Sequence, residues 1–238
     1  PKLNALRRNG SFAFGVKQDL GDSSNIRFIT GLAEEDNGFL GLSGSGAFTL
    51  DGAETSTAFS GVNFASDISP NLSFGALAIY ADSEMFNRGH TMLSGVDQAV
   101  SNSFGLNLEG SNIWGSDRLE ISLAQPNRIQ EGSMRVRLTN LADAEGNLTY
   151  RSELVSLEPS GRQIDLSVGY AREVSSDFVF STKLSRTSQL NHIRDTDDIT
   201  SAYLGARYKN LLIGATTSAV EDELLSLIHI SEPTRPLT

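Results

Sequence analysis

The feature that most constrains this chain is an alternation of apolar and polar residues that recurs from Ser11 to about Ser218. Successive side chains of a β-strand point to opposite faces, so a period of two places the apolar residues of each segment on one face. Helical periodicity is nearly absent. The chain is therefore predicted to be all-β. The predicted apolar faces are Phe12, Phe14 and Val16; Ile26, Phe28 and Leu32; Leu72, Phe74, Ala76, Ala78 and Tyr80; Phe104, Leu106 and Leu108; Leu119, Ile121 and Leu123; Met134, Val136 and Leu138; Ile164, Leu166, Val168 and Tyr170; Phe178, Phe180 and Leu184; and Ala202, Leu204, Ala206 and Tyr208.

Short polar segments with turn-forming residues separate these runs. They are "EEDNG" at 34–38, "LDG" at 50–52, "SPN" at 69–71, "AEGN" at 144–147 and "EPSG" at 158–161. Gly, Asn and Asp tolerate positive φ, and Pro presets one turn dihedral. About thirteen candidate strands joined mainly by short turns predict antiparallel neighbours in a meander. The exception is 83–99, which is long for a connection and is predicted to be an exposed loop.

Composition excludes several classes of protein. The 238 residues carry a net charge of -10, which gives little support to binding of nucleic acid through its phosphates. The chain has no cysteine, so it can form neither a disulfide framework nor a thiolate metal site. The longest apolar run, "FGALAIYA" from Phe74, is far shorter than the roughly 20 residues that a membrane-spanning helix needs. If the chain crosses a membrane, it must do so as strands.

The face opposite the apolar stripe decides between a soluble fold and a membrane barrel, because alternation is common to both. That face combines small residues with charges of both signs, as a hydrated lumen would accept. Glu120 is expected to pair with Arg135 or Arg137 on an adjacent strand. The alternative is the solvated outer face of a soluble sandwich. Segment length favours the membrane, since several runs are near the span of a tilted transmembrane strand. The predicted lumen-facing charges are Arg118, Glu120, Arg135, Arg137, Asp165, Lys183 and Arg207.

Three segments, 39–50, 118–138 and 157–173, resemble the C-terminal β-domains of bacterial autotransporters (type V secretion). The likeness is greatest to those that follow a subtilisin-like serine peptidase in alphaproteobacteria. One motif, Gln-Pro-x-Arg-x-x-x-Gly, falls on Gln125, Pro126, Arg128 and Gly132. The other falls on Pro159, Ser160, Gly161, Arg162, Asp165, Leu166, Gly169 and Tyr170. The resemblance implies a twelve-stranded barrel in the bacterial outer membrane that anchors and helps export an N-terminal passenger. It also implies outer-membrane lipid and the barrel assembly machinery as partners.

The two ends of the chain read differently from its middle. Residues 225–235, "LSLIHISEPTR", match the translation of one reading frame of a transposase library adapter. We therefore expect 225–238 to be adapter read-through. The predicted β-barrel domain then covers 11–224, and its own terminal strand is expected to be incomplete. Residues 1–10 are interpreted as a linker or the remnant of a pore helix. Because the chain opens on Pro1, we expect it to be an internal piece of a longer reading frame.

Candidate sites for chemistry are few. "GLSGSG" at 41–46 nearly fits a nucleophile elbow, but alternation places Ser45 inside a strand and a second Gly is missing. His90 lies in the predicted long loop, where a solvated side chain is favoured over a catalytic base. "RDTDD" at 194–198 could bind calcium but lacks the Gly and distal Glu of the loop motif. We expect no catalytic, cofactor or metal site and no enzymatic activity in this chain.

The sequence thus predicts an outer-membrane translocator and anchor domain, an antiparallel meander closing as an approximately twelve-stranded barrel. Its passenger is expected to be a subtilisin-like serine peptidase. The alternative is a soluble β-rich accessory or binding module of a secreted serine peptidase. In the first case Phe12, Leu106, Val136 and Leu166 contact lipid. In the second they form a protein core.

Overall fold

A computed structural model of the chain describes residues 9–89, 91–142, 148–220 and 223–231, the last segment and residues 141, 142 and 148 by their backbone only. The predicted all-β fold is confirmed. The strands are β1 (Gly10–Asp19), β2 (Ser24–Asp36), β3 (Ala53–Ser69), β4 (Leu72–Asn87), β5 (Leu93–Ser111), β6 (Asp117–Ala142), β7 (Leu148–Ser156), β8 (Ile164–Ser175), β9 (Phe178–Ser188), β10 (Ile199–Tyr208), β11 (Leu211–Val220) and β12 (Glu223–Ser231). Two short 3-10 helices, η1 (Gly46–Phe48) and η2 (Leu190–His192), lie in connections.

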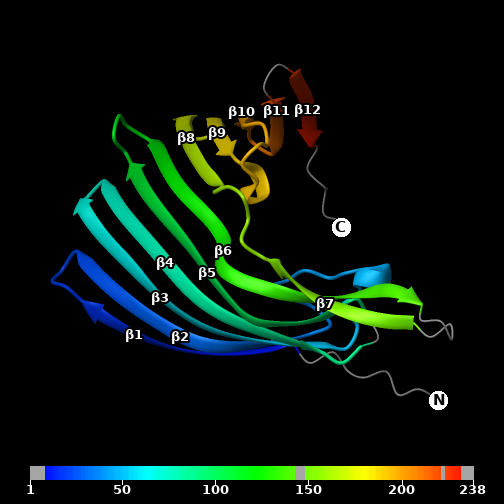
Figure 1. The fold of residues 1–238 in the computed structure, drawn as a ribbon. Coiled ribbons are helices and arrows are strands. Elements are labelled where there is room, and N and C mark those ends of the chain that lie inside the picture. The colour runs from blue at the N-terminus through cyan, green and yellow to red at the C-terminus, as the bar shows by residue number, and fades with distance from the viewer. Residues whose placement is uncertain (1–8, 90, 143–147, 221–222, 232–238) are drawn as a thin grey trace, which may run out of the picture.

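All twelve strands belong to one sheet, in which each neighbour is antiparallel and nearly every strand pairs with the next along the chain. The predicted meander is therefore confirmed. Within the described residues β1 pairs with β2 alone and β12 with β11 alone, so the sheet is a strongly curved trough that is not closed (Figure 1). Residues 1–8, which are most of the predicted linker, lie outside the described residues. So do residues 232–238, the end of the predicted adapter segment.

The connections differ in length between the two ends of the sheet. At one end they are the short turns 20–23, 70–71, 112–116, 176–177 and 209–210. At the other end lie the longer connections 37–52 and 189–198. We call these the short-turn end and the long-loop end. The predicted loop at 83–99 is wrong, because β4 continues to Asn87 and β5 begins at Leu93. One register shift in the β4–β5 pairing, between Ser83 and Met85, and four in the β5–β6 pairing hide the alternation from the sequence.

The sheet has a tall half and a short half. Strands β3 to β6 contain 17, 16, 19 and 26 residues, whereas β8 to β11 contain 12, 11, 10 and 10. The step falls along β6, which pairs with β8 through its first residues and with β7 through its last. The sequence predicted two separate strands here, and the structure has one. Between Ala124 and Ser133, β6 has no strand on that side.

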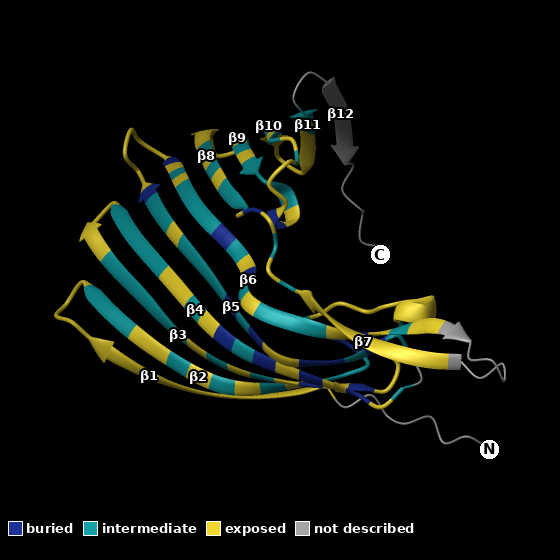
Figure 2. Cartoon of the chain, viewed as in Figure 1, coloured by how far each residue is buried: buried dark blue, intermediate teal, exposed yellow. Residues whose placement is uncertain are grey.

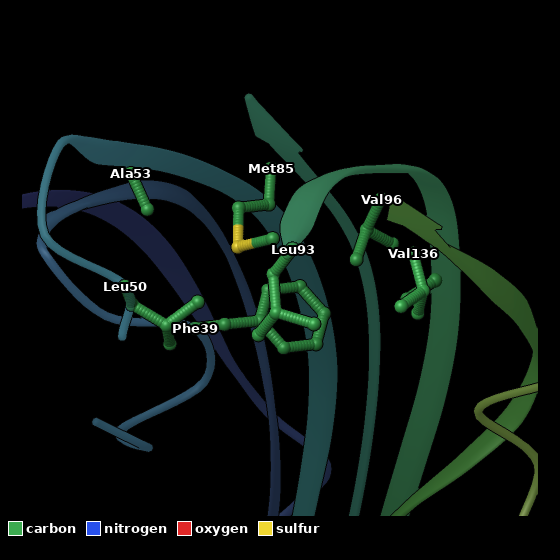
Figure 3. Packing of buried hydrophobic residues seen from close by; sticks show 8 residues of the cluster. Phe39, Leu50, Ala53, Met85, Leu93, Val96 and Val136 are labelled. Carbon is green, nitrogen blue, oxygen red and sulfur yellow. The ribbon is translucent and has the colours of Figure 1, made fainter. Parts of the chain in front are cut away.

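The buried apolar residues gather at the long-loop end, where the connection 37–52 folds against the tall half of the sheet. Phe39 and Leu50 from this connection pack on Met85, Leu93 and Val136 of the strands (Figure 3). Most of the remaining sheet surface is partly or fully exposed (Figure 2). In the described residues this cluster holds eight of the nine buried apolar side chains.

Candidate functional site

The apolar stripe forms one continuous surface across the sheet. The strand register places Phe14 beside Thr30, Val16 beside Phe28, and Phe28 beside Val62, all on one face. The same face continues through Leu106 and Leu123 to Leu166. Its large side chains are open to the outside: Phe12 is 72% exposed and Leu204 54%. We call this the outer face, and it is where alternation predicted Phe12, Leu106 and Leu166.

The opposite face, which we call the inner face, carries small and hydroxyl-bearing side chains. One row crosses the sheet from β5 to β11 at a single level: Asn107, Ser122, Ser167, Ser185, Ser201 and Ser218. Ser122 and Ser167 share a hydrogen bond between their hydroxyl oxygens at 2.7 Å, and Ser201 and Ser218 share one at 2.9 Å. Short polar side chains at neighbouring positions let the sheet curve tightly while the inner face stays polar.

Five of the predicted lumen-facing charges share the inner face with this row: Arg118, Glu120, Asp165, Lys183 and Arg207. Arg118 donates to Glu109 across the β5–β6 pair at 3.2 Å. Glu109 lies directly opposite Glu120, so Arg118 offsets the repulsion between two neighbouring carboxylates.

Arg135 and Arg137 lie elsewhere, and the predicted pairing of Glu120 with either of them is wrong. All three residues belong to β6, so they cannot meet across adjacent strands. Arg135 instead binds Asp97 at 2.6 Å, on the outer face together with Glu54 and Phe86. The sequence could not show that 118–124 and 133–139 are one strand, because the bulged stretch between them breaks the period of two.

Val136 corrects the prediction for the apolar stripe. It is 7% exposed and lies on the inner face, under the connection 37–52. At the long-loop end the stripe therefore changes face: Ala53, Met85 and Val96 point inward, while Glu34, Glu54 and Glu84 point outward. The same strands thus have an apolar outer face over their part near the short turns and a polar outer face beyond it.

The two motifs of the autotransporter resemblance meet at the step along β6. Arg128 is buried, and its guanidinium crosses to the segment 157–163 that links β7 to β8. It donates from Nε to the Gly161 carbonyl at 2.8 Å and from Nη2 to the Pro159 carbonyl at 3.1 Å. Its Nη1 donates to Gln130 Oε1 at 2.9 Å. We call this contact region the motif junction.

Arg162 makes the reciprocal contact, from the second motif back to the first. Its Nη1 donates to Gln125 Oε1 at 2.5 Å, and Gln125 in turn donates to Asn102 Oδ1 at 2.9 Å. Gln130 donates to the same Asn102 oxygen at 2.9 Å. Gln125 is 1% exposed, and these bonds use both polar atoms of its amide, as a buried amide requires.

His192 ties the connection 189–198 into the motif junction. Its Nδ1 accepts from the Gln163 backbone N–H at 2.9 Å, so Nε2 carries the proton and donates to the Asn127 carbonyl at 3.0 Å. Burial lowers the pKa of His192, and the guanidinium groups of Arg128 and Arg162 lower it further, against the raising effects of the Asn127 carbonyl and Asp165. The ring is therefore held neutral.

The motif junction replaces a missing part of the β-ladder. Between Ala124 and Ser133 no strand pairs with the side of β6 that β7 and β8 occupy elsewhere. Side chains and loops supply donors instead: His192 to the Asn127 carbonyl, Arg128 to the Ile129 carbonyl and the Leu157 N–H to the Gly132 carbonyl. The sequence showed Arg128 and Arg162 only through a resemblance. Nothing in its periodicity marked Asn102, Gln130 or His192.

The other candidate residues lie in connections between strands or outside the described residues. Ser45 precedes η1 in the connection 37–52 and is not inside a strand, contrary to the alternation. His90 lies outside the described residues. Asp198 binds Arg186 at 2.6 Å. In the described ranges, no three His, Cys, Asp or Glu side chains are grouped to hold a metal ion. No helix in the described part of the chain is long and apolar enough to cross a membrane.

Comparison with known proteins supports the fold and leaves the family open. No family model and no curated protein matches the chain. A solved structure described as "TodX deltaS2S3 mutant monoaromatic hydrocarbon channel" is similar with a TM-score of 0.52 at 13% identity, over 94% of this chain and 69% of that chain. "CymD monoaromatic hydrocarbon channel" gives 0.48 at 12%, over 89% and 73%. The first of these likenesses shows that the chain has a β-barrel fold, whose sheet is open in the described residues.

Proposed function

We propose that this chain is the outer-membrane translocator and anchor domain of an autotransporter, which exports and tethers an upstream passenger. The observation that carries the proposal is the exposed apolar stripe on the outer face of strands whose inner face is small, polar and charged. In water such a surface would aggregate. In a bilayer the same apolar surface contacts the lipid chains, and the polar inner face lines a hydrated pore.

The change of face along the tall strands supports a membrane boundary. Where lipid covers the outside, apolar side chains belong on the outer face. Where water covers the outside, they belong on the inner face, under a covering loop. Val62 and Leu106 lie outward in the part near the short turns, and Met85 and Val96 lie inward at the long-loop end. The membrane edge is proposed to lie between these two levels.

Two further features orient the barrel. Aromatic side chains mark the short-turn end, where Trp114 and Tyr170 have ring centroids 6.2 Å apart and Tyr208 lies on the outer face. Aromatic girdles are typical of membrane interfaces, and short turns of outer-membrane barrels face the periplasm. The long-loop end, with the motif junction and the connection 37–52, is then proposed to face the outside of the cell.

The soluble alternative would need a second layer over the outer face. A sandwich buries its apolar stripe between two sheets about 10 Å apart. Here the described strands form one sheet, and Phe14, Phe28 and Leu184 on its outer face remain more than half exposed, at 60%, 54% and 53%. The autotransporter assignment and the peptidase passenger rest on the two motifs quoted above, and these now have a shared structural role at the motif junction.

Surface display in bacteria tests this function. The chain is produced behind a signal peptide and a reporter peptide, and intact cells are treated with added protease. The proposal predicts that the chain fractionates with the outer membrane, needs detergent for extraction, and exposes the reporter to protease. If the chain is in the outer membrane but the reporter stays protected from protease, the chain is a barrel that does not translocate a passenger, and the proposed export function is wrong. A chain that is soluble without detergent would support the accessory module.

A further inference from the structure

Strand β7 is the one strand that lies off the path of the sheet. In the described part of the chain it pairs with β6 alone, and its other side has no strand beside it. The β6–β7 hairpin projects past the start of β8, so the short half of the sheet leaves this edge uncovered (Figure 1). Residues 149–156 are exposed (Figure 2), including Tyr150 at 59% and Leu154 at 66%. An edge of this kind presents unpaired backbone N–H and C=O groups to a further strand.

The sequence of β7, "LTYRSELVS", is complementary to itself in the antiparallel direction. When two copies are aligned about Ser152, Arg151 of each lies opposite Glu153 of the other. In the same alignment Tyr150 lies opposite Leu154, again twice. Directly opposed charges of unlike sign and aromatic–aliphatic pairs both stabilise antiparallel strands. A twofold contact requires this property, because the same patch must fit itself.

We propose that two copies of this chain associate edge to edge through β7, in an antiparallel register centred on Ser152. Within one copy Arg151 and Glu153 already form an ion pair at 3.0 Å on one face of the strand, with side chains 62% and 48% exposed. Charged residues usually protect an edge strand from a partner. Here the two charges are opposite and symmetrically placed about Ser152, so a second copy neutralises them.

The alternative occupants of this edge fit less well. An unrelated extended peptide would need its own acidic and basic residues at matching positions, whereas a second copy supplies them. In the described residues β1 and β12 are also edges of the sheet, and β1 lies along the exposed apolar stripe with Phe12 and Phe14. The β7 edge pairs with the end of β6 whose outer face carries Arg135 and Arg137, beyond the apolar stripe, so it can pair in water. The inference does not depend on what the barrel exports.

Disulfide trapping tests the proposal directly, because the chain contains no cysteine. Opposed residues of antiparallel strands have Cα atoms about 4.5–5.5 Å apart, within the range of a disulfide. Ser152→Cys places the thiols of the two copies opposite each other at the twofold axis. The full chain with this substitution, folded in detergent and mildly oxidised, is expected to migrate mainly as a disulfide-linked dimer. Val155→Cys is the matched control, since it is also exposed but lies opposite Thr149, and it should remain mainly unlinked.

A charge exchange separates specific pairing from random collision. Arg151→Glu in the Ser152→Cys background puts two glutamates opposite each other at both ends of the contact, and the cross-link should be lost. Adding Glu153→Arg restores unlike charges, and the cross-link should return. Equal cross-linking of Ser152→Cys and Val155→Cys, no cross-linking of either, or insensitivity to Arg151→Glu would each overturn the proposal. So would mass-spectrometric identification of a polypeptide other than this chain attached to Cys at 152.

Discussion

Arg128 is expected to be the residue whose loss most weakens the step along β6. The substitution Arg128→Met keeps the apolar stem and removes the guanidinium. It leaves the carbonyl oxygens of Gly161 and Pro159 without the donors that now reach them at 2.8 and 3.1 Å. Gln130 Oε1 still accepts a second, longer hydrogen bond from Arg162 at 3.4 Å, so it keeps a donor.

The magnitude follows from the two carbonyl groups. A buried acceptor that loses its partner costs about 1–3 kcal/mol, and a hydrogen bond from a charged donor is at the upper end of that range. The contact with the Gly161 carbonyl is buried and that with the Pro159 carbonyl is only partly buried, so their joint loss lowers the free energy of unfolding by about 2–4 kcal/mol. The matched control is Arg135→Met in the same strand. Its ion pair with Asp97 is 44% and 67% exposed, so its loss should cost about 1 kcal/mol or less.

The assay is guanidinium-induced unfolding in detergent, followed by the fluorescence of Trp114, the single tryptophan. The midpoint should fall for Arg128→Met with little change in slope, because the surface exposed on unfolding is nearly the same. Limited proteolysis should also begin in the segment 157–163 before the rest of the chain. Equal losses for Arg128→Met and Arg135→Met would refute the reasoning, because the motif junction would then contribute no more than a surface ion pair.

Two further predictions concern the long-loop end. The pKa of His192 is lowered in the folded chain, so the unfolded state takes up a proton first as pH falls below the ordinary value near 6.5. The stability that the neutral ring contributes is thus present at pH 7.5 and lost on acidification. His192→Gln should flatten the dependence of unfolding free energy on pH between about 7 and 5, and an unchanged slope would contradict this. Met85→Ala, at 3% exposure, should cost about 2–5 kcal/mol, whereas Phe86→Ala, on the opposite face at 63% exposure, should cost about 1 kcal/mol or less.

Alternation was sufficient to predict the strands and the two faces near the short turns. Phe12, Leu106 and Leu166 share the outer face, and Glu120, Asp165 and Lys183 share the inner face, because a period of two survives wherever strands pair without bulges. The pattern failed for Val136, because the apolar residues change face at the long-loop end, where the connection 37–52 covers the inner face. A period of two records that one face is apolar and not which way that face points.

Bulges and long-range contacts explain the remaining differences. The β5–β6 pairing shifts register at four places between Leu93 and Phe104, so the sequence could not show that 83–99 continues two strands or that β6 is unbroken. The motif junction depends on contacts such as that of Arg128 with Gly161, 33 residues apart. Such contacts leave no periodic signal, and only the resemblance of the two motifs pointed to these residues.

The central claim is that lipid contacts the outer face, and a pair of arginine substitutions on adjacent residues tests it most directly. Leu184 lies outward in β9 and Ser185 lies inward in the hydroxyl row. Folding free energies are measured in phospholipid vesicles. Leu184→Arg should cost about 2–4 kcal/mol, as arginine does on the lipid face near the bilayer midplane. Ser185→Arg should cost about 1 kcal/mol or less, because it points into water. A larger loss of folding free energy for Ser185→Arg than for Leu184→Arg would mean that lipid contacts the inner face, and this would contradict the barrel.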